Sequence, residues 1–214
     1  MVEFRRWKVS PSELKLHYIE KWVAGKSVLD VGCGLGFYSK YLASKGFEVV
    51  AIDKEKQFKS AAFKFKIARA TNLPFKNKSF DTALLFDVLE HVADAKRTLQ
   101  EIKRVVRKRV IISVPNDDDS ALTQHNLTFK HQKDTTHVGF YTVKSISSQL
   151  RKYGFRIKLI KLENAVSPFL FARLIRIKAI RALFMAATYV MKKFGLFDLP
   201  KADVYIVADV KSEA

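Results

Sequence analysis

Apolar and polar residues follow two different periods along the chain, and the alternation between them predicts its secondary structure. Short apolar runs predict buried strands, which we place at residues 27–31, 48–52, 66–70, 81–86, 109–114, 155–162 and 204–208. Apolar residues three and four positions apart predict helices, which we place at 11–23, 36–45, 95–107 and 142–153. Strands that alternate with helices favour a parallel sheet with right-handed crossovers, so we expect an α/β fold.

The segment 164–201, between the last two predicted strands, departs from this alternation. It is rich in Phe, Leu, Ile, Ala and Met, and a connection of that length is expected to form one or two helices of its own. Four basic residues interrupt its apolar run: Arg173, Arg176, Lys178 and Arg181. They exclude a membrane span of about 20 apolar residues. On a helical wheel they scatter, which predicts a weakly amphipathic segment. Lipid contact, a substrate-covering cap or dimer contact, and core packing stay open as its role.

The composition is that of one globular domain with a strongly basic surface. The 214 residues include 39 Lys and Arg against 21 Asp and Glu, a net charge of +18. This excess predicts an anionic partner (nucleic acid, a phospholipid surface or an acidic substrate) unless it only makes the surface generally basic. The single cysteine, Cys33, suits a reducing compartment, and no apolar signal segment follows residues 1–10. We therefore expect a cytoplasmic protein.

Residues 27–36, Ser-Val-Leu-Asp-Val-Gly-Cys-Gly-Leu-Gly, carry the most specific signal. An apolar strand with one acid, Asp30, ends in three alternate glycines, Gly32, Gly34 and Gly36. Glycines permit a tight turn and a close approach of backbone to a ligand, because no Cβ intrudes. A helical pattern begins directly afterwards, so backbone N–H groups at its start complete a cradle suited to a nucleotide.

This segment resembles motif I of the class I S-adenosylmethionine (SAM)-dependent methyltransferases, and further landmarks of that family follow in the same order. They lie at 49–53, 73–75, 79–81, 87–91, 110–116, 137–142 and 153–155. The resemblance covers roughly residues 25–160 and points to the quinone-biosynthesis-like, type-11 branch. It implies a Rossmann-like, seven-stranded, mostly parallel sheet with helices on both faces and an antiparallel last strand. It also implies SAM as the cofactor and methyl transfer as the reaction.

On this basis the chain divides into four parts within a single domain. We expect an N-terminal helix or lid at 1–24, the SAM-binding core at 25–163, an apolar and basic helical insert at 164–201, and the last strand with the C-terminus at 202–214. The insert therefore precedes the last strand.

The resemblance assigns roles to the residues around the glycine turn. Gly32, Gly34 and Gly36 let the backbone approach the methionine part of SAM. Asp30 is placed to attract the ligand's ammonium group, directly or through water. Asp53 ends the second strand and is expected to accept both ribose hydroxyls, since a carboxylate has two acceptor oxygens. Capping a helix is its alternative role.

The adenine side departs from the family. Relatives often have an acid before the Leu-Pro-Phe landmark, where this chain has Arg69. An arginine cannot accept a hydrogen bond from the adenine amino group. Recognition is therefore expected from the backbone around Ala70, or from Thr71 or Asn72.

Three apolar residues complete the expected cofactor pocket. Leu73 and Phe75 are expected to line the adenine, with the core as the alternative place for both. Phe86, at the end of a predicted strand, is also expected to touch the cofactor.

The acceptor side is expected around Asp87, Glu90 and His91. At spacings of three and four, these residues share one face of a predicted helix. The grouping resembles an acid-x-x-Glu-His arrangement in two metal-using branches of the family, the quinone-biosynthesis O-methyltransferases and the small-RNA 2′-O-methyltransferases. Because Leu-Glu-His is also common in relatives without metal, we predict no metal. A metal-free catalytic or substrate role and a structural role stay open.

Three histidines occupy the polar loop 115–141, which is expected to overhang the active site: His125, His131 and His137. A histidine with a pKa near neutrality can take a proton from an acceptor hydroxyl or amine. We take His91 and His137 as candidates for the catalytic base, against the alternative of ordinary structural positions.

These features predict a SAM-dependent methyltransferase that acts on an oxygen or carbon of a small or lipid-linked acceptor, because the insert is apolar and the loops are large. An RNA methyltransferase is the first alternative, favoured by the charge but not by any appended RNA-binding module. A non-catalytic SAM-binding scaffold or regulatory subunit is the second. The expected partners are the acceptor, an anionic membrane surface and, as the weaker alternative, RNA.

Overall fold

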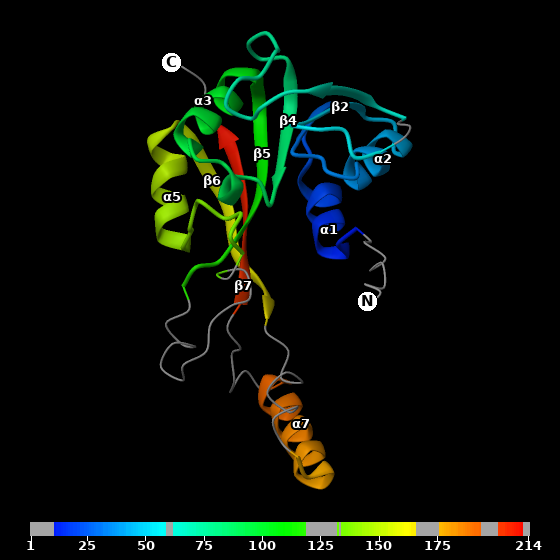
Figure 1. The fold of residues 1–214 in the computed structure, drawn as a ribbon, viewed down its shortest axis with the longest axis vertical. Helices are drawn as coiled ribbons and strands as arrows, with labels where there is room; N and C mark the ends of the chain where they lie inside the picture. The colour runs from blue at the N-terminus through cyan, green and yellow to red at the C-terminus, as the bar shows by residue number, and fades with distance from the viewer. Residues whose placement is uncertain are drawn as a thin grey trace, which may run out of the picture.

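The computed structural model describes residues 11–58, 62–118, 132, 134–165, 176–193 and 201–211. Its strands form one seven-stranded sheet in the order β3-β2-β1-β4-β5-β7-β6 (Figure 1). Strands β1 to β5 pair in parallel, and β7 inserts antiparallel between β5 and β6. The predicted Rossmann-like α/β fold and its antiparallel last strand are confirmed.

The elements follow the predicted alternation closely. The strands are β1 (Ser27–Val31), β2 (Glu48–Asp53), β3 (Lys64–Ile67), β4 (Phe80–Phe86), β5 (Val106–Pro115), β6 (Phe155–Ala165) and β7 (Lys201–Val210). The helices are α1 (Glu13–Trp22), α2 (Phe37–Ser44), the 3-10 turn η1 (Leu89–His91), α3 (Ala95–Val105), α5 (Val143–Lys152) and α7 (Lys178–Lys193). The largest error concerns β3, which was placed at 66–70. The strand ends at Ile67, and a short antiparallel bridge between Arg69 and Asn72 follows.

Local capping explains where three helices begin. Ser12 accepts a hydrogen bond from the N–H of Lys15 at the start of α1, and Asp94 accepts one from Arg97 at the start of α3. Thr142 caps α5, as predicted, in a capping box. Each cap satisfies a backbone donor that the first helical turn leaves without a partner.

The sheet has a hydrophobic core on each face. On one face α3 and α5 pack through Leu99, Ile102, Ile146 and Leu150. On the other face α1 and α2 pack through Tyr18, Ile19 and Leu42. The predicted helical spacing of α3 is confirmed by the complete burial of its apolar stripe. Both layers leave the carboxyl ends of the parallel strands at one edge, where ligands bind in open α/β sheets.

Helix α7 lies apart from the sheet, beyond the end at which β6 stops (Figure 1). The expectation of a weakly amphipathic insert was wrong for this helix, because Arg176 precedes it and Arg173 lies outside the described residues. The two remaining charges of that set, Lys178 and Arg181, share one side of the helix. Among the described residues, none of the helices combines the length and apolar content that a membrane crossing needs.

Candidate functional site

The glycine turn after β1 is tied to the end of β2. The N–H groups of Gly32 and Cys33 both donate to the carbonyl of Ile52, at 2.9 and 3.1 Å. The N–H of Gly34 donates to Asp53 Oδ2 at 2.8 Å. Two segments predicted separately as cofactor-binding are therefore one hydrogen-bonded unit.

Each glycine of the turn has a positive φ, and their surroundings differ. A Cβ on Gly32 would lie 2.7 Å from Val88 Cγ2, and one on Gly36 would lie 2.8 Å from Phe63 Cζ. A Cβ on Gly34 would have nothing within 4 Å. Gly32 and Gly36 thus allow close packing of the turn, whereas Gly34 borders the open space in which a ligand could approach the backbone.

Asp30 lies beneath this turn with its side chain almost entirely enclosed. It is 2% exposed and accepts a hydrogen bond from Ser39 Oγ at 2.5 Å. Burial raises the pKa of Asp30 to about 6, and the nearby charge of Asp53 adds to this effect. A cation beside Asp30 would offset the cost of burying its charge, so this environment suits the expected ammonium group.

Asp53 has one hydrogen bond on each carboxylate oxygen. Besides the bond from Gly34 to Oδ2, the N–H of Lys54 donates to Oδ1 at 2.7 Å. A carboxylate oxygen has two acceptor positions, so each still has room for a ribose hydroxyl. No helix begins at Asp53 in the described structure, and the alternative role of a helix cap is therefore wrong.

The segment expected around the adenine begins beside Asp53. The N–H of Ala68 donates to the carbonyl of Asp53 at 2.9 Å, and Arg97 Nε donates to the carbonyl of Thr71 at 3.3 Å. Ala70 is partly buried at the margin of the core. The backbone on which adenine recognition would depend is thus held next to the proposed ribose position.

Leu73 and Phe75 are placed by α3. Leu73 is 3% exposed, and its N–H donates to Glu101 Oε2 at 2.8 Å. Arg104 donates to the carbonyls of both residues and pairs with Glu101. Leu73 is part of the core, which favours the alternative to a pocket-lining role, while Phe75 is partly buried and packs edge-on against Phe80.

Helix α1 reaches the same edge of the sheet near Phe86. Phe86 is buried, and the ring of Tyr38 meets it edge-on with centroids 5.2 Å apart. Tyr38 Oη accepts a hydrogen bond from the N–H of Ser12 at 3.1 Å. Lys15 Nζ lies 5.5 Å from the centroid of Phe86 and pairs with Asp87. These contacts place the start of α1 over the end of β4.

The structure brings His91 and His137 together. Their ring centroids lie 4.7 Å apart, and His91 Nδ1 lies 3.2 Å from both the carbonyl and the hydroxyl oxygen of Thr136. The N–H groups of Val138 and Gly139 donate to the carbonyl of Glu90, which holds this segment against η1. His125 and His131 lie outside the described residues.

Glu90 completes a cluster of three potential metal ligands. One donor atom each from Glu90, His91 and His137 lies within 4.8 Å of the others. Glu90 is 1% exposed, and neither carboxylate oxygen has a hydrogen-bond partner within the described part of the chain. Burial raises the pKa of Glu90 to about 8. The sequence signal for this residue was an acid enclosed by apolar neighbours, but its lack of a partner had no such signal.

Asp87 does not share a helical face with Glu90 and His91, and that expectation was wrong. Asp87 has a φ of 55° and precedes η1, a single turn that begins at Leu89. Its Oδ1 accepts a hydrogen bond from Ser113 Oγ at 2.7 Å, and its Oδ2 pairs with Lys15. The turn out of β4 directs this carboxylate to α1, a contact that the sequence analysis missed.

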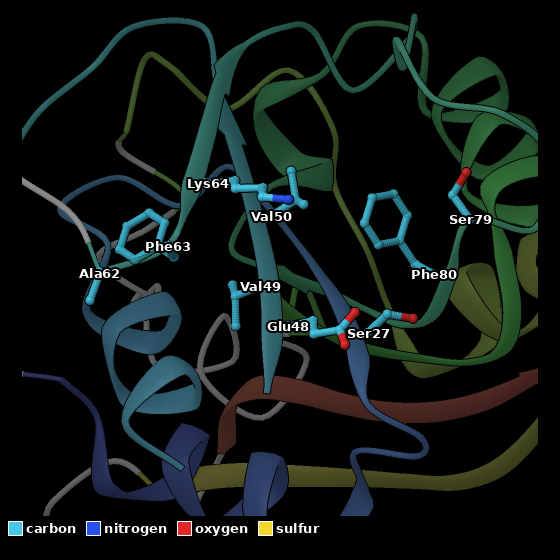
Figure 2. A pocket seen from close by; sticks show the side chains of 9 residues that line it. All are labelled: Ser27, Glu48, Val49, Val50, Ala62, Phe63, Lys64, Ser79 and Phe80. Carbon is cyan, nitrogen blue, oxygen red and sulfur yellow. The ribbon is translucent and has the colours of Figure 1, made fainter. Parts of the chain in front are cut away.

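A cavity of about 530 Å³ lies at the other edge of the sheet (Figure 2). Ser27, Glu48, Lys64 and Phe80, which begin β1 to β4, are among its lining residues. This is the edge opposite the glycine turn and the cluster of Glu90, His91 and His137. The cavity is therefore separate from the candidate site.

Comparison with known proteins gives a family model that matches most of the chain. The model of a methyltransferase domain matches residues 5–159. That range includes the glycine turn, Asp53, and the cluster formed by Glu90, His91 and His137.

Individual relatives are more distant. An uncharacterised protein of Methanocaldococcus jannaschii is 32% identical over 162 residues, covering 62% of this chain and 62% of its own length. An O-methyltransferase of Aspergillus sclerotiorum is 32% identical over 97 residues, covering 39% of this chain and 37% of its own length. The chain thus spans less than two thirds of these curated relatives. The crystal structure of a SAM-dependent methyltransferase from Archaeoglobus fulgidus has a TM-score of 0.65 at 19% identity, covering 91% of this chain and 90% of that one.

Proposed function

The chain belongs to the methyltransferase-domain family, and we propose that it transfers a methyl group from SAM to an oxygen or carbon of a small or lipid-linked acceptor. SAM is the cofactor of this enzyme class. The single observation that carries the proposal is the convergence of a cofactor cradle and an unpaired acid–histidine cluster on one edge of the sheet. The similarity to a fungal O-methyltransferase supports an oxygen acceptor.

The cradle residues fit the cofactor on physical grounds. Asp30 is a buried carboxylate whose charge an ammonium would stabilise. Gly34 leaves its side of the turn open, and Asp53 retains acceptor positions for ribose hydroxyls. We assign the backbone around Ala70 and Thr71 to the adenine, with Phe86 at the floor of the site.

The enzyme's main task is alignment. The sulfonium of SAM supplies an activated methyl group, so the protein contributes by holding the acceptor atom in line with it and by excluding competing nucleophiles. In this proposal the N-terminal part, residues 1–24, acts as a lid on the core 25–163. Lys15 holds α1 against the end of β4 through Asp87.

We assign proton removal to His91, with His137 beside it. A proton on His91 Nδ1 can be donated to the carbonyl of Thr136, which leaves Nε2 as the basic nitrogen. The buried carboxyl of Glu90 stabilises a positive charge that forms on the imidazole pair when it takes up the acceptor's proton.

A divalent cation is the second candidate at this cluster. The specific observation is Glu90, whose two carboxylate oxygens are buried without a partner among the described residues. One carboxylate and two imidazoles are donors that a transition-metal ion accepts. Calorimetric titration of the chelator-treated protein with Mn²⁺ separates the candidates: binding that His137→Ala removes would establish a metal centre and overturn our prediction of none.

The transfer assay uses SAM with a labelled methyl group and fractionated cell extract. Label in a lipid or small-molecule fraction supports the proposal, and His91→Gln should remove transfer while S-adenosylhomocysteine still binds. Label in RNA would instead establish the RNA methyltransferase alternative. Cofactor binding with no transfer to any fraction would favour the scaffold alternative.

A further inference from the structure

Helix α7 lies at the same edge of the sheet as the candidate site. Strand β7 is antiparallel to both β5 and β6, so β6 runs parallel to β5 and ends at the carboxyl edge. The chain leaves the sheet there after Ala165 and returns at Lys201 to begin β7. Figure 1 shows α7 beyond this edge, away from the layers of the core.

One side of α7 exposes large apolar residues in a continuous stripe. Five of them share this side, with exposed fractions of 60% for Ile177, 51% for Ile180, 71% for Leu183, 50% for Val190 and 39% for Met191. Ile177 directly precedes the helix, and the others follow at spacings of three, seven and one. An exposed apolar stripe of this kind is unfavourable in water and marks a surface that is covered by something else.

The opposite side of α7 is basic. Lys178, Arg181 and Lys193 lie on it, and the helix contains no acidic residue. The whole chain has a net charge of +18. A second copy packed against α7 would bring two strongly cationic surfaces together, which is unfavourable. A surface that is apolar inside and anionic outside satisfies both sides of the helix.

We propose that α7 lies in the plane of an anionic membrane surface. Ile180, Leu183 and Met191 enter the boundary between headgroups and acyl chains, and Lys178 and Lys193 face the anionic headgroups. This orientation turns the carboxyl edge of the sheet, with its acid–histidine cluster, toward the lipid. The inference rests on the proposed function only where it implies an acceptor carried by the lipid phase.

Vesicle co-sedimentation of the full chain tests the proposal. Vesicles of phosphatidylcholine with about one third phosphatidylglycerol should bind the protein, whereas pure phosphatidylcholine should not. Binding should weaken when salt rises from about 0.1 M to about 0.5 M, because salt screens the attraction to headgroups. Leu183→Asp should weaken binding about tenfold or more, since it removes a buried aliphatic side chain and adds a charge of the wrong sign.

Two matched controls separate α7 from the general charge of the protein. Ile67→Asp introduces the same acid at an equally exposed aliphatic residue (70%, against 71% for Leu183) on the edge strand β3, and should keep vesicle binding. Lys178→Glu should weaken binding more than Lys45→Glu on the core, although both change the net charge equally.

Equal loss in the α7 variants and their controls would overturn the proposal, as would an absence of binding to anionic vesicles. Sedimentation equilibrium showing a dimer that Leu183→Asp dissociates would assign the stripe to a second copy instead. S-adenosylhomocysteine binding, measured on the same variants, should be unchanged. A protein that binds vesicles but not S-adenosylhomocysteine would contradict the proposed function and leave the membrane inference standing.

Discussion

The cofactor side and the acceptor side of the candidate site are built in opposite ways. Asp30, Gly34 and Asp53 belong to one continuous stretch of strand, turn, helix and strand, and each has a hydrogen-bond partner within it. Glu90 and His137 come from separate segments, and the carboxylate of Glu90 has no partner among the described residues. The cofactor side is thus preorganised, whereas the acceptor side contains a buried acid that is stabilised only by a proton, a cation or a charged imidazole.

The strongest way to break the preorganised side is to fill the turn. Gly32→Val places atoms against Val88 and forces a branched residue to a φ of 68°. We expect it to lower the free energy of unfolding by about 3–5 kcal/mol and to abolish S-adenosylhomocysteine binding. Gly46→Ala is the control: its φ is 81° but a Cβ there meets nothing within 4 Å, so only the backbone strain remains. Chemical denaturation and calorimetry would measure both effects; an unaffected Gly32→Val protein would contradict the tight packing of the turn.

The acceptor side should reveal its unpaired acid through pH. Burial holds the native pKa of Glu90 at about 8, against about 4.5 in the unfolded chain. The native state therefore binds more protons between these values, and its contribution to stability falls as pH rises from about 4.5 to about 8. Glu90→Gln should remove this loss and gain about 3 kcal/mol over the wild type at pH 9 relative to pH 5.

This measurement requires denaturation curves in chelator-treated buffer. The same slope in wild type and Glu90→Gln would show that Glu90 titrates normally. A wild-type stability at high pH that increases with added Mn²⁺ would instead assign the carboxylate to a metal.

A smaller effect is expected where the cofactor side meets its ligand. Asp53→Asn keeps the acceptor oxygen to which Gly34 donates but removes the negative charge. It should weaken S-adenosylhomocysteine binding by about 1–3 kcal/mol, the range for hydrogen bonds to a charged group. Calorimetry would measure the dissociation constant. Glu55→Gln, two residues away, removes the same charge as a control, and equal losses in the two variants would exclude a specific ribose contact.

The smallest effect concerns the link between the two sides. The pair of Lys15 and Asp87 joins α1 to the end of β4, and the Asp87 side chain is 49% exposed. A double-mutant cycle of Lys15→Met and Asp87→Asn should give a coupling of about 0.5–1 kcal/mol, because solvent screens the pair. A coupling in the free energy of unfolding that is indistinguishable from zero would show that Lys15 does not hold α1 in place.

The amino-acid sequence by itself determined the cofactor side, the order of elements and the helix caps. Residues 27–53 form strand, glycine turn, helix and strand as predicted, and Ser12 and Thr142 cap the helices that they precede. These features depend on hydrogen bonds and side-chain periods within a few residues, so a local pattern is sufficient to indicate them.

Only the tertiary structure decided the acceptor side, the place of Leu73 and the character of α7. His91 meets His137 because the segment after Thr136 packs against η1, a contact between residues 46 positions apart. Asp87 turns away from Glu90 because the backbone leaves β4 at a positive φ. The two faces of α7 emerge only once the helix is known to begin at Lys178. Each of these outcomes depends on where an element ends and what packs against it, and neither residue type nor spacing specifies that.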